Sequence, residues 1–508
     1  MIFKYINKAA SLLAAIVLGF TAVSCADKSD TEPSQDEYTI SSYRKEFVFT
    51  FREGVMKSTV TTNAPVWSVK TSYTWINVSS IENESGERVI EVKVSENGSS
   101  DQRVGHFDLI GSDENGKELV RTSVIVTQNP KRGVVDGAIL FDDSTFENYI
   151  LDDFDQNSDG AITEEEAARI ITLDLENTGI NSVGGVRYFP NLDHLDVSDN
   201  NVKYIDVSGL QKLASLFFNM NKVSSLKVEN CSALQSIMGR TNKLQSVDFS
   251  TIADHLKVLD LSQNVLTSAN LSGMTSLEYA ALGKNNIVSL DLTGCSKVSI
   301  LSIPSNQISE LDLSDLAELL TLDCSENNLQ SLDLTSCTKL GLLNVNKNSR
   351  LNQLDLSKSP IVDLDICGTK IASLNISKPS DVATLKMSNT LFETFDFAAY
   401  SGLTILHCSD MKNLASGNID LKANILLKEF VCKNSNITAV DFSNAKELVE
   451  VDLQNNKLTS LDLSNSKKLT SVKVSGNSDL TTLYISKDLK GSSTLKIEKG
   501  QTCTVIYK

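Results

Sequence analysis

Oxygen-bearing side chains alternate along the segment from Asp155 to Glu166, whose residue types and spacing suit metal chemistry. Calcium takes six to eight oxygen ligands from carboxylates, carbonyls and water. Positions one, three and five carry such side chains, position seven offers a backbone carbonyl, position nine a hydroxyl, and position twelve a second carboxylate. The candidate ligands are Asp155, Asn157, Asp159, Ala161, Thr163 and Glu166. The spacing predicts a calcium-binding loop; the alternative is a plain Asx-rich turn that caps the following helix.

The segment is similar to the EF-hand calcium loop at every diagnostic position, including Gly160 at the sharp turn and Ile162 as the apolar anchor. A single loop directly before a repeat region indicates a structural Ca²⁺ ion rather than a sensor pair. Similar loops precede the repeats of Bacteroidetes leucine-rich-repeat proteins. We therefore expect one cofactor, a structural calcium ion.

A repeat of about 21 residues follows the loop and fills most of the remaining chain. The template Leu-x-x-Leu-x-Leu-x-x-Asn begins, after a degenerate copy at Ile170, at Leu192, Leu213, Leu234, Leu256, Leu277, Val298, Leu319, Leu340, Ile361, Val382, Leu403, Leu427, Leu448 and Leu469. So short a unit cannot bury its own leucines, so coils stacked about 4.8 Å apart must share one core. The sequence predicts a mainly β repeat solenoid at 170–485, a linker and cap at 131–169, and a C-terminal cap at 486–508.

Alignment of the units places polar residues in columns. The last template position is an inward asparagine, expected to satisfy backbone groups from coil to coil, at Asn200, Asn221, Asn242, Asn264, Asn285, Asn306, Asn327, Asn348, Asn456 and Asn477. The column lapses between Thr369 and Ser435, which predicts the least regular coils at about 361–440. A second column is outward and acidic, at Asp206, Asp248, Asp291, Asp312, Asp333, Asp396, Asp441 and Asp462. We interpret it as a solvated stripe, with a cation-binding ladder as the alternative.

Cysteines occupy two further columns, where they pack as small hydrophobes. Cys324, Cys408 and Cys432 share the sixth template position, and Cys231, Cys295 and Cys337 share a later one. Only Cys408 and Cys432 fall on adjacent coils, so a disulfide is conceivable there alone. The unit at 322–334 resembles those of Bacteroidetes leucine-rich-repeat lipoproteins and, more loosely, of the cysteine-bearing internalins. The resemblance implies a binding scaffold without fixing the partner.

Residues 38–130 alternate apolar and polar side chains in short runs separated by polar turns, which predicts a small all-β, Ig-like antiparallel sandwich. Trp67-Ser68-Val69, Trp75-Ile76, Arg103-Val104-Gly105 and the closing Val124-Ile125-Val126-Thr127-Gln128 resemble the BACON domain of Bacteroidetes surface proteins. The resemblance implies carbohydrate binding or a spacer role. Trp67 and Trp75 are accordingly candidate glycan-binding residues; the alternative is that both only pack against the sandwich.

The first 24 residues read as an export signal, with Lys4 and Lys8 before an apolar run too short to span a membrane. Ala22-Val23-Ser24-Cys25 resembles the bacterial lipobox, which implies lipidation of Cys25; a plain signal-peptidase cut is the alternative. Residues 25–37 form a polar, acidic tether, which resembles the export signal of surface lipoproteins. We expect a lipid-anchored protein of the outer membrane that faces the cell exterior.

One solvent-facing column suggests where a partner binds. The third template position reads Val258, Tyr279, Ile300, Thr321 and Leu342 on consecutive coils, with Phe217, Met238 and Arg240 beside it. Consecutive exposed apolar residues with an arginine at the margin are typical of an interaction patch. Alternatively, shielding by neighbouring side chains leaves the patch inert.

Catalysis is not expected. The four histidines are His106, His194, His255 and His407, which the repeat register separates, and no nucleophile elbow, zinc-protease motif or phosphate loop occurs. The net charge of −17 disfavours nucleic acid. We therefore expect a monomeric binding protein that recognises a protein through the solenoid, or alternatively a glycan through the sandwich. A purely structural role in the envelope is the third possibility.

Overall fold

The computed structural model describes residues 38–49, 53–82, 88–97, 103–128, 134–135, 138–415 and 417–508. The predicted signal peptide (1–24), the predicted lipidation site Cys25 and the tether up to residue 37 lie outside the described residues.

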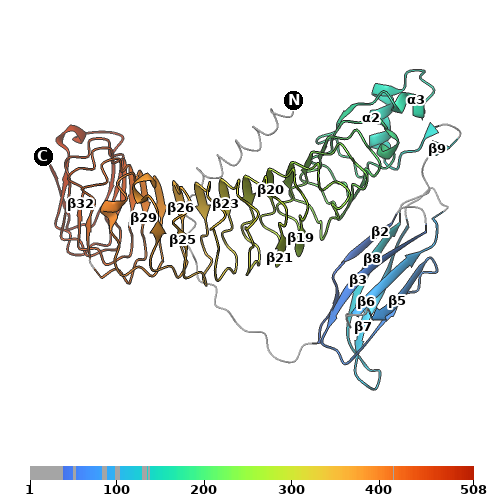
Figure 1. Cartoon of the computed structure of the whole chain (residues 1–508), viewed down its shortest axis with the longest axis horizontal. Helices are drawn as coiled ribbons and strands as arrows, with labels where there is room; N and C mark the ends of the chain where they lie inside the picture. The colour runs from blue at the N-terminus through green and yellow to red at the C-terminus, as the bar shows by residue number, and fades with distance from the viewer. Residues whose placement is uncertain are drawn as a thin grey trace.

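Two four-stranded sheets pack face to face in the N-terminal domain (Figure 1). One has the order β1-β3-β6-β5, with strands Ile40–Ser42, Gly54–Thr62, Arg88–Val94 and Ile76–Glu82; the other has the order β2-β8-β7-β4, with strands Glu46–Phe49, Glu118–Gln128, Arg103–Ser112 and Val66–Lys70. Alternation along the strands buries residues such as Phe47, Ile90 and Phe107 between the sheets. The predicted sandwich is confirmed, except that β2 and β8 pair in parallel.

A small cap joins the sandwich to the solenoid. It contains α2 (Ser144–Phe154), α3 (Glu164–Ala167) and a sheet of β9 (Val134–Val135), β10 (Ala138–Ile139) and β11 (Ile162–Thr163). Asp143 caps α2 by accepting from the Phe146 N–H at 2.9 Å, and Phe146 and Ile150 are buried in the same core as the first coils. The helices thus close one end of the solenoid (Figure 1). None of the helices in the described ranges is long and apolar enough to cross a membrane.

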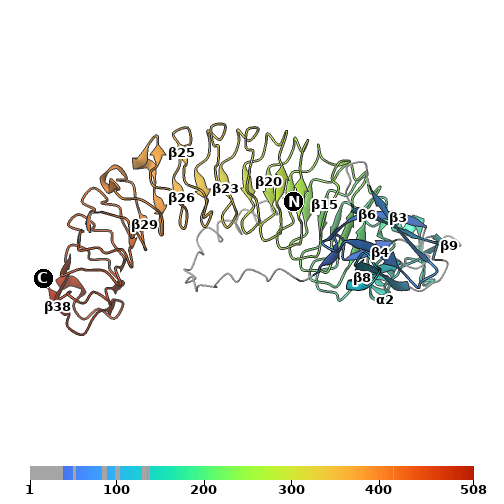
Figure 2. The same ribbon diagram turned by 90° about the horizontal axis from the view of Figure 1, so that it is seen from below.

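The repeats build one sheet of sixteen parallel strands that follows an arched solenoid (Figure 2). The strands are β12 (Thr172–Asp174), β13 (His194–Asp196), β15 (Ser215–Phe217), β17 (Ser236–Met238), β18 (Val258–Asp260), β20 (Tyr279–Ala281), β22 (Ile300–Ser302), β23 (Thr321–Asp323), β24 (Leu342–Asn344), β26 (Asp363–Asp365), β28 (Thr384–Lys386), β29 (Ile405–His407), β31 (Glu429–Val431), β33 (Glu450–Asp452), β35 (Ser471–Lys473) and β37 (Lys496–Glu498). In almost every strand the central residue points into the core. The leucine-rich-repeat solenoid predicted from the sequence is confirmed.

The second apolar segment of each coil forms shorter ladders. These are β14 (Tyr204–Asp206) with β16 (Ser225–Lys227), β19 (Ser268–Asn270) with β21 (Ser289–Asp291), β25 (Asp355–Leu356) with β27 (Asn375–Ile376), β30 (Asn418–Asp420) with β32 (Ala439–Asp441), and β34 (Ser460–Leu463) with β36 (Thr482–Ile485) and β38 (Thr504–Tyr507). Strands β37 and β38 extend both faces, so the segment expected as a C-terminal cap is one more coil of the solenoid.

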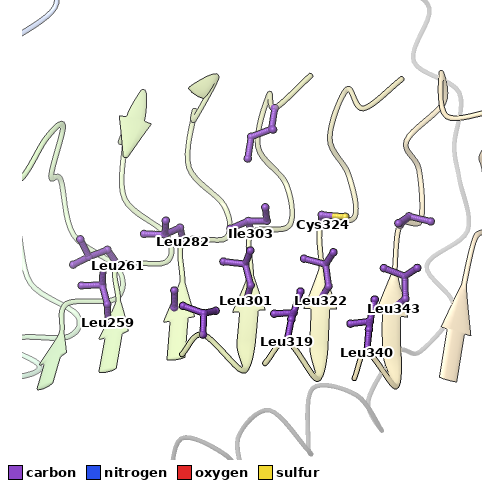
Figure 3. Packing of buried hydrophobic residues seen from close by; sticks show 14 of the residues in the cluster. Leu259, Leu261, Leu282, Leu301, Ile303, Leu319, Leu322, Cys324, Leu340 and Leu343 are labelled. Atoms are coloured by element: carbon purple, nitrogen blue, oxygen red, sulfur yellow. The ribbon is translucent and has the colours of Figure 1, made fainter. Parts of the chain in front are cut away.

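Stacked aliphatic residues fill the space between the two faces, with Leu301, Leu322 and Leu343 in register on successive coils (Figure 3). Cys324 continues the column of Ile303 as a small apolar residue, as expected. The asparagine ladder is also confirmed. Asn285 is typical of it, because its Nδ2 donates to the carbonyls of Leu261 at 3.0 Å and Leu282 at 2.9 Å.

The ladder is replaced where the sequence lacks asparagine. The Thr369 and Thr390 hydroxyls donate to the carbonyls three residues earlier, at 2.8 and 2.7 Å. This stretch also contains the short 3-10 turns η2 (Pro379–Asp381) and η3 (Phe397–Ala399). The expectation of irregular coils at about 361–440 is therefore confirmed, although the long sheet continues through them without a break.

Candidate binding face and calcium loop

The predicted partner-binding residues lie on one side of the sixteen-stranded sheet. Each strand contributes three outward residues: its first residue, its third residue, and the residue two positions after the third. We call the surface formed by these residues the long-sheet face. Phe217, Met238, Val258, Tyr279, Ile300 and Leu342 come from β15, β17, β18, β20, β22 and β24, and Arg240 follows Met238 by two residues. Adjacent strands are about 4.8 Å apart, so these side chains necessarily touch their neighbours.

Their exposure is lower than the sequence suggested. Phe217 and Val258 are only 8% exposed, while Met238, Tyr279 and Ile300 are half-buried, as are Leu342 and Arg240. The ring of His194 stands edge-on to Phe217 with 5.1 Å between ring centroids, which explains the burial of Phe217. Phe217 and Val258 are thus corrected from exposed contact residues to residues that support the half-buried ridge beside them.

Two apolar residues missed from the sequence extend this ridge. Leu320 and Val362 directly precede β23 and β26 and are 49% and 47% exposed. Gly341 separates them on the intervening coil. They adjoin Leu342, so the most exposed apolar surface lies around β23, β24 and β26. The signal was present at the second template position, where most other units carry polar or small residues.

Carboxylates on the same face were also missed. Burial raises the pKa of Asp260, although the charge of Arg240 opposes the shift. Burial likewise raises the pKa of Asp323, against hydrogen bonds from Ser325, and the charge of Asp365 adds to the shift. These side chains are held in Asx turns, since the N–H groups of Ser262 and Ser325 donate to them at 2.9 and 3.0 Å. Fixed, partly desolvated charge therefore lies beside the apolar ridge.

Toward the C-terminus, acidic and basic side chains on the long-sheet face pair with one another. His407 Nε2 lies 2.7 Å from Glu429 Oε1, and Lys473 Nζ lies 3.0 Å from Glu450 Oε1. The pKa of Glu429 is lowered, first by its hydrogen bond with His407. These pairs satisfy one another across neighbouring coils, so this part of the face offers less unbalanced charge to a partner.

The acidic column on the second segment has a local structural role. Each carboxylate accepts from the backbone N–H two residues later, as Asp291 does from Thr293 at 3.0 Å and Asp333 from Thr335 at 2.9 Å. That backbone hydrogen bond is the first cause of the lowered pKa of Asp291 and of Asp333. Most of the column is exposed. The solvated stripe is thus confirmed, and its spacing follows from a repeated Asx turn.

The candidate calcium ligands run from Asp155, which follows α2, to Glu166 in α3. The Asp155 Oδ2 atom accepts from the Gly160 N–H at 2.9 Å, and Asn157 Oδ1 accepts from the Asp159 N–H at 2.9 Å. The Glu166 carboxylate accepts from the Thr163 N–H at 3.0 Å, the first cause of its lowered pKa. The loop therefore curls its oxygens inward from both ends.

One atom of the loop remains unsatisfied. Asp155 Oδ1 is buried and has no hydrogen-bond partner. A buried carboxylate oxygen with no donor is costly unless a cation or water reaches it. The donor set is composed of oxygens and suits a hard cation such as Ca²⁺. Thr163 and Glu166 also form a capping box on α3, so the predicted alternative, a helix-capping turn, is realised in the same loop.

Both tryptophans are partly covered by packing. Trp67 and Trp75 are half-buried and pack against the sandwich core. The Arg103 guanidinium lies over the Trp75 ring, 4.5 Å from its centroid, and Tyr73 meets that ring edge-on. Packing covers part of each ring, so the structure does not show the fully exposed tryptophan expected for glycan stacking, and glycan binding at these residues stays a prediction.

None of the cysteines in the described ranges forms a disulfide bond. Cys432 Sγ donates to the Cys408 carbonyl at 2.9 Å, and burial raises the pKa of Cys408 well above its usual value. The conceivable disulfide between these two residues is not formed in the structure.

Comparison with known proteins identifies the fold. The functional domain of InlJ from Listeria monocytogenes, described as including a cysteine ladder, is 26% identical and superposes with a TM-score of 0.52 over 64% of this chain and 70% of that chain. The internalin inlF from L. monocytogenes is 18% identical, with a TM-score of 0.40 over 72% of this chain and 95% of that one. The leucine-rich effector YopM from Yersinia pestis is 17% identical, with a TM-score of 0.39 over 66% and 82%. No protein-family model matches the sequence, and the comparison with curated proteins gives no significant match.

Proposed function

Because the chain has an internalin-like leucine-rich-repeat solenoid, a scaffold suited to protein interaction, we propose that it is a non-catalytic binding protein that recognises a protein partner through the long-sheet face. The observation that carries the proposal is the mainly apolar ridge from Met238 through Tyr279 and Ile300 to Leu342, which Thr321 interrupts and which the exposed Leu320 and Val362 extend. Contiguous apolar surface of this kind is typical of interaction sites.

Preorganisation supports this choice of face. Each strand is fixed between two neighbours, and the side chains beneath the ridge are buried, so a partner meets a surface that is already ordered. Binding to an ordered surface avoids the entropic cost of immobilising it. Half-buried Met, Tyr and Ile side chains also suit the central, desolvated part of an interface.

The test is the double variant Met238→Ser and Tyr279→Ser, examined by crosslinking on intact cells that display the protein. Loss of the crosslinked partner with an unchanged melting temperature supports the proposal. The matched control is Val288→Ser with Ile425→Ser, two residues that are each 54% exposed and lie off the long sheet. The proposal fails if the control pair removes the partner equally well, or if no protein is crosslinked through the wild-type face.

We further propose that Cys25 is lipidated and anchors the chain at the outer face of the outer membrane. The small-residue sequence before Cys25 and the acidic tether after it support this localisation. Cys25→Ser should release the protein into the soluble fraction. Proteolytic shaving of intact cells should remove the wild-type protein; complete protection from protease would contradict outward display.

A structural calcium ion in the cap completes the proposal. Asp155, Asn157, Asp159 and Glu166 would hold the ion through side-chain oxygens, with the Ala161 carbonyl and Thr163, directly or through water, as further ligands. The unpartnered Asp155 Oδ1 is the observation that favours the ion. The ion would neutralise the loop carboxylates and hold α2 and α3 against the first coil.

Catalysis and glycan recognition receive less support. His194 contacts Phe217, His255 lies 3.4 Å from Asp254 and His407 pairs with Glu429, each on a different coil. A general acid–base site needs such groups to converge on one substrate. The packed tryptophans leave the glycan alternative without an observation in its favour.

A further inference from the structure

The middle of the long-sheet face is acidic and contains no cationic side chain. On the six strands from β18 to β26, the three outward positions carry Val258, Asp260, Ser262, Tyr279, Ala281, Gly283, Ile300, Ser302, Pro304, Thr321, Asp323, Ser325, Leu342, Asn344, Asn346, Asp363, Asp365 and Cys367. Four are carboxylates, and none of these positions, all within the described part of the chain, is lysine, arginine or histidine. Arg240 stands on the coil before and Lys386 on the strand after, while in the column that directly precedes the strands Lys257 is followed on the next coil by Glu278.

Small residues form a shallow floor between two of these carboxylates. Ala281 and Ser302 follow Asp260 in the same column, and Asp323 closes it on the next coil. Gly283 and Pro304 continue the floor, in such close contact that a Cβ on Gly283 would lie 2.9 Å from the Pro304 ring. Asp260 and Asp323 are three coils apart, or about 14 Å at the spacing of neighbouring strands. An arriving side chain can therefore approach the backbone between two fixed negative charges.

Ionisation of Asp260 and Asp323 is energetically unfavourable because both carboxylates are partly removed from water. Asp260 is only 9% exposed, and burial raises its pKa and that of Asp323. The Asx turns satisfy one oxygen of each, through Ser262 and Ser325. A cation brought close to partly desolvated carboxylates is attracted more strongly than to the same groups in water.

Resting on the proposed function, we infer that the partner presents an apolar segment bearing lysine or arginine side chains, whose cations lie at Asp260 and Asp323 while its apolar side chains pack on Tyr279, Ile300 and Leu342. Charge complementarity selects this occupant, because an acidic segment would face four carboxylates with no cation among them. The residues of the apolar ridge supply contact area, and the aspartates set which sequences bind.

The test uses the purified full chain and three short fluorescein-labelled peptides at physiological ionic strength. One peptide alternates leucine with lysine, the second leucine with glutamate and the third serine with lysine. The variant is Asp260→Asn with Asp323→Asn, because asparagine retains the Asx-turn acceptor and already occupies this column at Asn344, where it accepts from the Asn346 N–H at 3.1 Å. The control is Asp291→Asn with Asp333→Asn, two Asx-turn aspartates on the second segment.

The leucine–lysine peptide should bind most tightly, and its Kd should rise at least about tenfold in the Asp260/Asp323 pair and less than about twofold in the control pair. The inference is overturned if the leucine–glutamate peptide binds as well, or if both pairs weaken binding equally. A cell-surface partner lost with Met238→Ser and Tyr279→Ser but unaffected by the Asp260/Asp323 pair overturns the inference and leaves the proposed function standing. If no cell-surface partner is found, the proposed function is overturned. The peptide measurements then still test, independently, whether the long-sheet face prefers cationic apolar segments.

Discussion

The hydroxyl of Tyr43 in the sandwich donates to the Gln245 carbonyl in the solenoid at 2.8 Å, although 202 residues separate them. The same hydroxyl accepts from the Thr267 hydroxyl at 2.6 Å, so one side chain joins two coils. The contact falls where the second face has no strand, between the β14–β16 and β19–β21 ladders. The Gln245 carbonyl is therefore free of strand pairing on this face and can accept a hydrogen bond from the sandwich domain.

Tyr43→Phe removes both hydrogen bonds and keeps the ring. Each such bond stabilises by about 1 kcal/mol, so amide exchange around residues 245–267 should accelerate by roughly five- to thirtyfold. Hydrogen exchange measured by mass spectrometry checks this. Tyr38→Phe, at a tyrosine that is 43% exposed, should leave exchange unchanged. Equal exchange in all three proteins would mean that the two domains do not dock in solution.

Asn285→Ala should destabilise the central coils by roughly 2–4 kcal/mol, because it removes hydrogen bonds to three buried backbone groups and leaves the Leu266 N–H without an acceptor. The three groups are the Leu261 and Leu282 carbonyls and the Leu266 N–H, which donates to Asn285 Oδ1 at 3.0 Å. Urea denaturation followed by circular dichroism measures the change. The exposed neighbour Asn286 is the matched control, and Asn286→Ala should shift the midpoint little.

Thr241→Asn should stabilise the chain by about 0.5–1 kcal/mol, because Thr241 is β-branched and has φ of 60°. Asparagine tolerates this left-handed region better. Thr241→Ala is the control, since both variants lose the 2.8 Å hydrogen bond to Gln263 but alanine gains no conformational advantage. Equal urea midpoints for the asparagine and alanine variants would contradict the role of backbone strain.

Asp323→Asn should raise the melting temperature at neutral pH by roughly 2 °C. Burial raises the folded-state pKa of Asp323, so the folded chain binds its proton more tightly than the unfolded chain does. The ionised carboxylate therefore destabilises the fold fully above the folded pKa, and the penalty disappears below the ordinary aspartate pKa. Melting curves of both proteins from pH 7 to pH 3 should converge at the acidic end. A constant difference across this range would contradict burial as the cause.

Titration of the chelator-treated chain with calcium should give a heat of binding, with Kd on the order of 10⁻⁵–10⁻³ M. Asp155→Ala should abolish it, because that change removes the buried, unpartnered oxygen. The acidic cluster of Asp174, Glu176 and Asp196 has carboxylate oxygens within 4.8 Å of one another and is the competing site. Asp174→Asn with Asp196→Asn should leave the heat intact; the reverse pattern would move calcium from the loop to that cluster.

The register of the solenoid followed from the sequence because the same requirement recurs in every unit. Each coil must bury a leucine where its neighbour does, and each turn must satisfy the same backbone groups. The role of Asn285 could therefore be interpreted without a structure. The left-handed residue before each asparagine was not recognised, since its side chains range from Asp199 to Met220 and share only backbone geometry.

Burial on the long-sheet face could not be predicted in the same way. Whether Phe217 is exposed depends on the size and orientation of His194 on the previous coil, which the column pattern does not encode. The desolvation of Asp260 depends similarly on the residues of adjacent coils. Contacts between domains, such as Tyr43 with Gln245, leave no periodic trace in the sequence. The calcium-loop pattern could be identified in the sequence because its candidate ligands lie within a few residues of one another, and it stays a prediction.

The asparagine of each coil forms hydrogen bonds with the preceding coil, and this affects how the number of coils can change in evolution. Each asparagine satisfies groups of the coil before it, and the same set recurs at successive boundaries, as Asn306 repeats for Leu282 and Ile287 what Asn285 does for Leu261 and Leu266. Where the asparagine recurs, recombination that removes or duplicates one whole unit rejoins equivalent partners, whatever the position of the breakpoint within the unit. A gain or loss of part of a unit leaves one boundary with unmatched groups. The number of coils can therefore change by whole units while the hydrogen bonds between adjacent coils are preserved.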